Sequence, residues 1–420
     1  MLFAHFNIGD KIFVRSAVCG AKALSDVLTA GSYSSTERKE MVGMKPYLKR
    51  AWAEVSLSQL KRNMEIIKSL NSEGTDIMAV VKADAYGHGY ERVCSTLAEE
   101  CGIKYFAVSN LDEAISVRSY CPDADILILG YTPPEYAHEI AQYNIIQGVV
   151  STDYANALSQ NSDKPVRCHV KIDTGMGRIG LRHDDPADCA KEIEFITRIN
   201  GISVEGIYTH FAVADSDDPD DVRYTDAQEK YITDTYDELL KLGIKLPHMH
   251  FMNSAATCYR NSERSTLSRA GIIIYGLHPD ISLDIPEGLE PIMELKAVIS
   301  QVKEIPEGAF VSYGRTFAAP HQMKVATVTI GYADGYSRML SSKGEILVHG
   351  RRCKIIGRVC MDQLMIDVSG VEARSGDIVT LIGRDGDDCI TADELASIYG
   401  TIGYEVVCGI SKRVPRIYID

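Results

Sequence analysis

The chain of 420 residues predicts an α/β fold, a (β/α)8 TIM barrel followed by a mainly β C-terminal domain. Two observations lead to this prediction. Apolar runs alternate with segments of helical period eight times, which is typical of a barrel of parallel strands. From about Pro291 the long helical segments stop, and short alternating runs between glycine-marked turns indicate a β-domain.

The first predicted helix follows Ser56-Leu-Ser-Gln59, a capping-box pattern, and carries an apolar stripe at helical spacing. The predicted barrel strands are Ile77–Lys82, Tyr105–Ser109, Asp125–Gly130, Ile145–Val150, Val166–Asp173, Val204–His210, His248–Asn253 and Leu267–Tyr275. Helices are expected between them, among others at Glu91–Glu100, Leu111–Tyr120, Pro134–Tyr143 and Ala227–Leu242. In such a barrel the functional residues lie where strands end.

The β-domain is predicted from five short runs, which are Val325–Ile330, Glu345–Val348, Cys353–Val359, Leu364–Val368 and Ile378–Ile382. We therefore expect a barrel over residues 44–289, whose first strand could pair with the C-terminal domain, and a β-rich domain over residues 290–420. Residues 1–43 show no sustained period and no continuous apolar core of a targeting peptide. We expect them to be a non-functional extension that results from a mis-annotated start, with Met44 as the natural one.

Composition narrows the class of protein. With 44 basic and 58 acidic residues the formal net charge is −14, which argues against nucleic-acid or anionic-membrane partners. The 11 cysteines show no metal-ligand spacing, so we expect reduced thiols, no metal and a cytoplasmic protein. No apolar run approaches the roughly 20 residues that span a bilayer.

Lys82 ends a fully apolar run, where its ammonium loses hydration unless it is paired. A desolvated lysine has a lowered pKa, which favours its use as a nucleophile toward a carbonyl group. The alternative is a lysine that reaches from a strand end into water. The strand alone leaves the two readings about equally probable.

The residues that follow Lys82 favour the nucleophilic lysine over the solvated one. Val80-Val-Lys82-Ala-Asp-Ala-Tyr86-Gly-His-Gly89 closely resembles the cofactor-lysine motif of bacterial alanine racemases, fold-type III enzymes whose lysine carries pyridoxal 5'-phosphate. The resemblance extends from about Met44 to the C-terminus. Its further segments are Lys171-Ile-Asp-Thr-Gly-Met-Gly-Arg178, Tyr208-Thr-His210, Asn253-Ser254, Ser268-Arg269-Ala-Gly271-Ile272, Ser312-Tyr313-Gly, Arg358-Val-Cys-Met361-Asp362 and Arg413-Val-Pro-Arg416.

The resemblance implies interconversion of L- and D-alanine, which supplies D-alanine for peptidoglycan, by a homodimer with shared active sites. It assigns the proton of the D-isomer to Lys82 and that of the L-isomer to Tyr313. Stereochemical inversion needs an acid/base group on each face of the substrate, which agrees with two such residues. Composition alone would make Tyr313 a packed tyrosine bonded to backbone. A phenol with a pKa of about 10 also needs nearby cations to act as a base.

The resemblance places Arg269 against the pyridine nitrogen, with His210 beside it, although a strand-end histidine is more often structural. A guanidinium has a pKa above about 12 and does not hand over a proton. Tyr86, Ser254 and the backbone N–H groups around Gly271 and Ile272 are expected to bind the phosphate.

Arg178 is expected to bind the substrate carboxylate, because its planar fork matches two oxygens; an exposed surface ion pair is the alternative. By resemblance, the backbone of Met361 from the partner subunit contacts the same carboxylate, with Asp362 beside it. Lys171 matches a lysine that is carbamylated in many racemases and that holds the arginine. An unmodified lysine, or a nearby chloride, stays open.

One position departs from the family. Many racemases of the bacillus type have tyrosine where this chain has Lys412, so strictness for alanine over serine is open. The alternative function is therefore a serine or broad-specificity amino-acid racemase. A decarboxylase of the same fold type lacks this combination of motifs, and a non-catalytic cofactor carrier lacks the second domain. Asp84, where the family often has asparagine, is a minor change.

Overall fold

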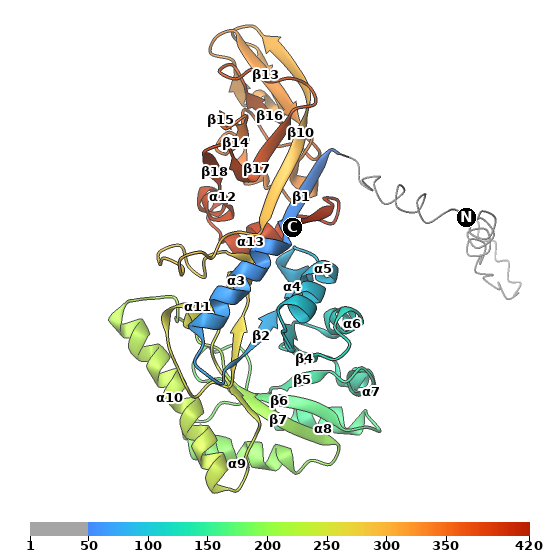
Figure 1. Ribbon diagram of the computed structural model, residues 1–420, viewed down its shortest axis with the longest axis vertical. Coiled ribbons are helices and arrows are strands. Elements are labelled where there is room, and N and C mark those ends of the chain that lie inside the picture. The colour runs from blue at the N-terminus through green and yellow to red at the C-terminus, as the bar shows by residue number, and fades with distance from the viewer. Residues whose placement is uncertain (1–48) are drawn as a thin grey trace, which may run out of the picture. The chain divides into compact units, whose positions relative to one another are not determined.

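The computed structural model describes residues 49–420, which form one compact unit; the expectation for residues 1–43 lies outside them. Eight parallel strands form the barrel in the order β8-β7-β6-β5-β4-β3-β2-β9 (Figure 1). The strands are β2 (Asp76–Val80), β3 (Tyr105–Val108), β4 (Asp125–Ile128), β5 (Ile146–Val149), β6 (Val166–Lys171), β7 (Ile202–Tyr208), β8 (His248–His250) and β9 (Leu267–Ala270). The Arg269 N–H donates to the Met252 carbonyl at 2.9 Å and so joins β9 to the chain just after β8. The predicted barrel is confirmed.

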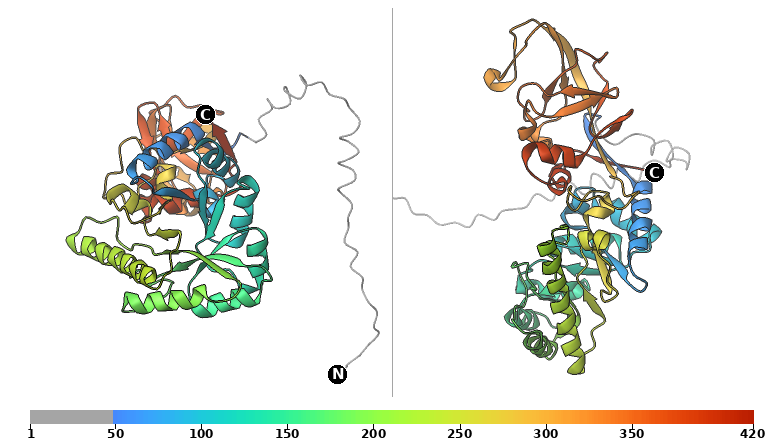
Figure 2. Two further views of the ribbon diagram at one scale, coloured as in Figure 1. Left: turned by 60° about the horizontal axis from the view of Figure 1, so that its bottom comes forward. Right: turned by 90° about the vertical axis from the view of Figure 1, so that its left-hand side faces the viewer.

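Helices cover the outside of these strands (Figure 1, Figure 2). They are α3 (Leu57–Leu70), α5 (Tyr90–Ser95), the π-helix η1 (Thr96–Glu100), α6 (Leu111–Tyr120), η2 (Pro134–Tyr136), α7 (Ala137–Gln142), α8 (Thr152–Gln160), α9 (Pro186–Thr197), α10 (Pro219–Lys241) and α11 (Ser254–Tyr259). The Ser56 hydroxyl accepts from the Gln59 N–H at 3.1 Å. Only this half of the predicted capping box forms, because the Ser56 N–H donates to the Ile292 carbonyl instead.

All eight predicted barrel strands end one to five residues earlier than expected, and two of the predicted runs continue into helical turns. The run Ile77–Lys82 leaves the sheet after Val80, and Lys82 begins the short helix α4 (Lys82–Tyr86). The run Leu267–Tyr275 divides at Gly271 into β9 and the 3-10 helix η3 (Ile272–Tyr275). An apolar run of this kind does not distinguish a buried strand from a buried helical turn.

The C-terminal region is built on a sheet of nine strands. They are β1 (Ala51–Ser56), β10 (Met293–Ile305), β13 (Met323–Val328), β14 (Glu345–Val348), β15 (Arg351–Lys354), β16 (Leu364–Asp367), β17 (Ile378–Asp385), β18 (Asp388–Ile390) and β19 (Arg416–Ile419). Strand β1 pairs antiparallel with β10 and parallel with β19. The short pair β11 (Phe310–Val311) and β12 (Phe317–Ala318) carries the turn η4 (Tyr313–Arg315).

The region also contains helices that the sequence analysis did not anticipate, α12 (Ala392–Tyr399), α13 (Gly403–Gly409) and the 3-10 turns η5 (Tyr332–Asp334) and η6 (Arg338–Leu340). Their short length explains the omission, since each offers at most about two turns of periodicity.

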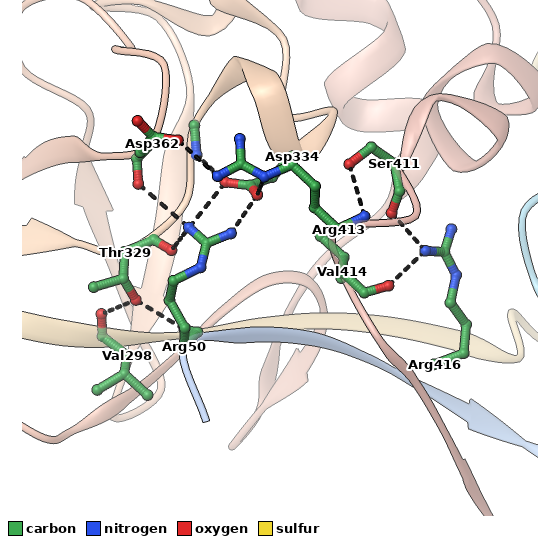
Figure 3. A network of polar contacts seen from close by, with 10 residues as sticks. Arg50, Val298, Thr329, Asp334, Asp362, Ser411, Arg413, Val414 and Arg416 are labelled. Atoms are coloured by element: carbon green, nitrogen blue, oxygen red, sulfur yellow. Dashed lines mark hydrogen bonds and ion pairs between the residues drawn. The ribbon is translucent and has the colours of Figure 1, made fainter. Parts of the chain in front are cut away.

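A network of charges joins four segments of this region that are distant in sequence (Figure 3). The carboxylate of Asp334, which is completely buried, pairs with the guanidinium of Arg50 and lies 3.6 Å from Nε of Arg413. Arg413 Nη2 also donates to Asp362 Oδ1 at 2.8 Å. A buried carboxylate is tolerated only when it is paired, so this network fixes the segment that carries Asp362 relative to β1 and the C-terminal strand.

Among residues 49–420, no helix is long and apolar enough to cross a membrane. Within the same range, no cluster of three or more histidine, cysteine or acidic side chains is arranged to hold a metal ion.

Candidate active site

A cavity of about 470 Å³ opens at the carboxyl ends of the barrel strands. It collects residues that the sequence analysis named, from five different segments of the chain. The predicted site residues that line it are Lys82, Tyr86, Lys171, Arg178, His210, Ser254, Arg269 and Gly271. Ile272 follows directly and is completely buried.

Lys82 is followed by an unusual backbone turn. Ala83, Asp84, Ala85 and Tyr86 all have φ between 52° and 56°, so α4 is a left-handed turn made of residues that are not glycine. Such a conformation is unfavourable by roughly 1–2 kcal/mol per residue. It therefore requires support from the rest of the structure.

Glu113 on α6 supplies part of this support. Its carboxylate accepts from the Ala83 N–H at 2.9 Å and from the Ser109 N–H at 2.7 Å, and so ties the turn to the end of β3. On the other side, Arg416 Nε donates to the Gly87 carbonyl at 2.7 Å. Gly87 is required here, because a Cβ would lie 2.4 Å from the Val407 carbonyl oxygen.

The Lys82 amine is held in an environment that favours its neutral form. Burial lowers its pKa, and the positive charge of Arg178 lowers it further. Its Nζ lies 5.9 Å from the centre of the Tyr86 ring. A lowered pKa makes more of the amine available in the unprotonated form that acts as a nucleophile and a base.

A small cradle lies at Gly271. A Cβ at this position would lie 2.9 Å from the Tyr86 hydroxyl and 3.4 Å from the Ser254 hydroxyl, so only glycine leaves the space between them open. The Gly271 N–H donates to Ser254 Oγ at 2.8 Å. Burial raises the pKa of Tyr86, so its hydroxyl keeps its proton and can donate to an anion. Ile272 begins η3 and presents its N–H at a helix start.

Arg269 is buried without a carboxylate among its hydrogen-bond partners in residues 49–420. Its Nη2 donates to the Thr209 carbonyl at 2.6 Å and lies 3.4 Å from Nδ1 of His210. Its Nη1 lies 2.9 Å from Nδ1 of His250. Burial lowers the pKa of Arg269 to about 10, which still leaves it charged at neutral pH. Each acceptor is therefore paired with a guanidinium that stays protonated.

The sequence analysis missed His250 and His169. Because arginine only donates, His250 Nδ1 must accept, and its Nε2 then carries the proton and donates to His169 Nδ1 at 2.8 Å. Burial lowers the pKa of both imidazoles, that of His169 to about 3. A sequence pattern could have indicated these histidines, because residues two apart on a strand face the same side of the sheet. His169 stands two residues before Lys171, and His250 two residues after His248.

Lys171 is buried and carries no carboxylate partner within the described chain. Its Nζ lies 3.4 Å from the Ile172 carbonyl oxygen and 5.1 Å from the centre of the Tyr208 ring. Burial and the charges of Arg269 and Arg178 lower its pKa well below the usual range. This environment favours the unprotonated amine over the ammonium.

Tyr313 and Met361 do not reach this cavity from their own chain. They line a separate hollow of about 450 Å³, where 70% of Tyr313 and 52% of Met361 is exposed. The residue before Tyr313, Ser312, has φ 69° and ψ 178°, a region that is essentially restricted to glycine. Its hydroxyl donates to the Arg358 carbonyl at 2.8 Å and helps to hold that conformation.

Both regions of the chain match a known protein family. Residues 55–279 match the family alanine racemase, N-terminal domain, and residues 292–418 match alanine racemase, C-terminal domain. The alanine racemase of Desulfovibrio desulfuricans is 43% identical over 376 residues, 88% of this chain and 98% of that protein. This chain belongs to the alanine racemase family. An alanine racemase from Bacillus anthracis, solved with bound L-Ala-P, superimposes with a TM-score of 0.83 at 36% identity, over 89% of this chain and 96% of that one.

Members of this family depend on pyridoxal phosphate, and the cavity of this chain fits that group. The donor set contains the amine of Lys82, whose pKa is lowered by burial, and a buried guanidinium at Arg269. The opening at Gly271, flanked by the hydroxyls of Tyr86 and Ser254, has the donors and the space that a phosphate requires.

Lys412, the position that departs from the family, does not line the cavity of Lys82. It lies in a different hollow together with Asp84, Tyr90 and Arg416. Asp84 itself accepts from the Tyr90 N–H at 2.9 Å, which uses its carboxylate to hold the left-handed turn.

Proposed function

We propose that this chain interconverts L- and D-alanine with pyridoxal phosphate held by Lys82. The observation that carries the proposal is the single cavity in which a desolvated lysine, a buried arginine and an open cradle at Gly271 meet. Its relatives of known name at about 40% identity are alanine racemases.

Arg269 would donate to the ring nitrogen of the cofactor, and Tyr86, Ser254 and Ile272 would hold its phosphate. When bound, pyridoxal phosphate withdraws electrons from the substrate and so acidifies its α-proton. Because Arg269 keeps its own proton, it orients the ring nitrogen without protonating it. His250 supports this role because its Nδ1 accepts from Arg269, and His169 in turn accepts from Nε2 of His250.

The proton is moved by two groups. The Lys82 amine would accept or return it on one face of the substrate, and the phenol of Tyr313 would do so on the other. Tyr313 lies in a separate, open hollow of its own chain, so we assign this role to the partner subunit's Tyr313. The active protein is then a homodimer in which each site uses both chains.

Arg178 would bind the substrate carboxylate, assisted by the backbone N–H of the partner subunit's Met361. Lys171 is a candidate for carbamylation, because its lowered pKa favours the unprotonated amine that adds to carbon dioxide and releases a proton to water. The resulting anion would be paired by the two neighbouring arginines. The added carboxylate would hold Arg178 in place.

We place the activity in the cytoplasm, where it would supply D-alanine for peptidoglycan. The alternative function, a serine or broad-specificity racemase, rested on the departure from the family at Lys412. Lys412 does not line the cavity of Lys82, so its position gives that alternative no particular support. The pocket of the assembled dimer decides between the two substrates.

The test is racemisation by the purified protein with bound cofactor. L-alanine should be converted to the racemate, L-serine much more slowly, and Lys82→Ala should abolish both the conversion and the visible absorption of a covalently held cofactor. Val81→Ala, beside it in the chain, is the matched control and should keep both. Failure to racemise alanine with the cofactor in place would overturn the proposal, and equal rates with serine would favour the alternative.

A further inference from the structure

Residues 360–362 form part of the wall of the hollow that contains Tyr313. The backbone N–H of Met361 donates to no group among residues 49–420, so it is available to a ligand. In the proposed function this N–H binds the substrate carboxylate in the site of the other subunit. The groups that fix the Met361 backbone therefore decide how well that carboxylate is held.

Asp334 holds the backbone on one side of Met361. Its Oδ2 accepts from the Gly331 N–H at 3.0 Å and so closes the turn η5. Two N–H groups of this turn donate to the carbonyls of Cys360 and Met361, each at 3.0 Å. The two segments pack backbone to backbone, because a Cβ at Gly331 would lie 2.3 Å from the Cys360 carbonyl oxygen. The position of Met361 is thus tied to a turn that Asp334 closes.

Asp334 also acts on the other side of Met361, where Asp362 follows (Figure 3). Its Oδ1 lies 3.6 Å from Nε of Arg413, and Arg413 Nη2 donates to Asp362 Oδ1 at 2.8 Å. Its Oδ2 also accepts from Arg50 Nη1 at 3.1 Å. Because Asp334 is completely buried, its charge requires these arginines, and it fixes Arg413 between two carboxylates.

We propose that Asp334 is a positioning residue for substrate binding, which sets the Met361 N–H of its own chain for the substrate carboxylate in the partner's cavity. The inference rests on the proposed function, in which Met361 serves the other subunit. An asparagine at this position keeps an acceptor for the backbone but loses the charge that orients Arg413. The contact with the carboxylate serves the bound substrate and the transition state alike, so its loss should raise KM and leave kcat nearly unchanged.

The experiment compares two mixed dimers with bound cofactor, each with a single Asp334→Asn. In the first, a chain with Lys82→Ala and Asp334→Asn is combined with a Tyr313→Phe chain. Its one complete site uses Met361 of the chain altered at Asp334. In the second, a Lys82→Ala chain is combined with a chain that carries Tyr313→Phe and Asp334→Asn. Its complete site uses Met361 of a chain in which Asp334 is intact.

The reference is the mixed dimer of Lys82→Ala and Tyr313→Phe. Compared with it, KM for alanine should be about tenfold higher in the first dimer, as for a lost hydrogen bond to a charged group, and unchanged in the second. Activity of the second dimer also shows that a chain with Asp334→Asn folds. If that chain does not fold, Arg413→Gln takes its place in both dimers, because it cuts the link to Asp362 and leaves the buried carboxylate paired with Arg50. Arg351→Gln, an exposed arginine of β15, is the control and should not change KM in either dimer.

Equal KM values in the two mixed dimers would overturn the inference, because a purely structural role of Asp334 does not depend on which chain completes the site. A rise confined to the second dimer would overturn it as well. Failure of the proposed shared site is recognised separately. It would leave the reference dimer inactive, with Asp334 unaltered, and the inference would fall with it.

Discussion

The cavity of Lys82 and the hollow of Tyr313 contrast sharply in burial. Arg269 in the cavity is 3% exposed, whereas Tyr313 in the hollow is 70% exposed. The cavity and the hollow nevertheless each contain a residue next to strained backbone. Lys82 precedes the left-handed turn, and Tyr313 follows Ser312, whose conformation is one that glycine usually adopts. Strained conformations persist only where the surroundings enforce them. The comparison teaches that one chain encloses the proposed cofactor pocket by itself but leaves Tyr313 open to solvent, which is what the proposed site shared between two subunits requires.

The largest effect on activity is expected when one residue of the cavity, Lys82, and one of the hollow, Tyr313, are replaced in separate variants. Lys82→Ala and Tyr313→Phe should each lower racemisation by at least about 10²–10⁴-fold, the range of a lost acid/base group. When the two inactive proteins are mixed and exchange subunits, about a quarter of the sites should be intact, because half of the dimers of a two-fold assembly are mixed and each holds one complete site. Activity of the mixture against each parent measures this.

Exchange must be demonstrated independently, for instance by native mass spectrometry of subunits of different isotopic mass. A mixture of Lys82→Ala with Lys82→Ala,Tyr313→Phe is the control and should stay inactive. Proven exchange without recovery would show that each site uses only one chain.

The next largest effect is expected from removing the hydrogen bond between Arg269 and His250 in the cavity. His250→Leu leaves a buried N–H of Arg269 without an acceptor, a penalty of about 1–3 kcal/mol that should lower kcat roughly tenfold to a hundredfold. His250→Gln, whose amide oxygen can accept, should recover much of the rate. Met249→Leu on the same strand is the control, and a rate as low as that of His250→Leu would indicate a general packing defect.

The sequence predicted the barrel well because parallel strands buried on both faces read as apolar runs. The bounds of α6 were also predictable, since Asn110 caps it and accepts from the Glu113 N–H. The left-handed turn was not predictable. Ala83 and Ala85 carry no signal for positive φ, and the turn depends on bonds from Glu113 and Arg416, which are distant in sequence.

The same limit applies to the site. Motifs named the residues that line the cavity, but the contact between His169 and His250 depends on the curvature of the barrel, because their strands β6 and β8 are not neighbours. The motif of Tyr313 likewise says nothing of its exposure. That property follows from the fold of the β11–β12 turn.

A smaller effect is expected from Lys171. If it is carbamylated, 13C-bicarbonate should give a carbamate signal that is absent from Lys171→Arg, and loss of the carbamate should raise KM for alanine about tenfold, as for one charge-assisted hydrogen bond to Arg178. Removal and return of bicarbonate should lower and restore the affinity. A KM indifferent to bicarbonate, with no carbamate signal, would contradict the modification and leave an unmodified lysine.

The smallest effect concerns the pH dependence of the free energy of unfolding. A histidine buried inside the barrel should contribute to it, whereas a histidine on the surface, with the same pKa in the folded and unfolded chain, should not. Burial lowers the pKa of His169 to about 3 in the folded protein, against about 6.5 when the chain is unfolded. Between these values the unfolded chain binds one more proton, so the free energy of unfolding falls as the pH falls, by up to about 1.4 kcal/mol per pH unit for this group. His169→Gln removes the proton site and should flatten the dependence by up to that amount, as measured by urea unfolding between about pH 5 and 6.5. Val170→Ala, buried on the same strand, should lower stability by a similar amount at every pH and leave the slope unchanged. A slope that His169→Gln does not alter would mean that this imidazole takes up its proton in the folded protein as readily as in the unfolded chain.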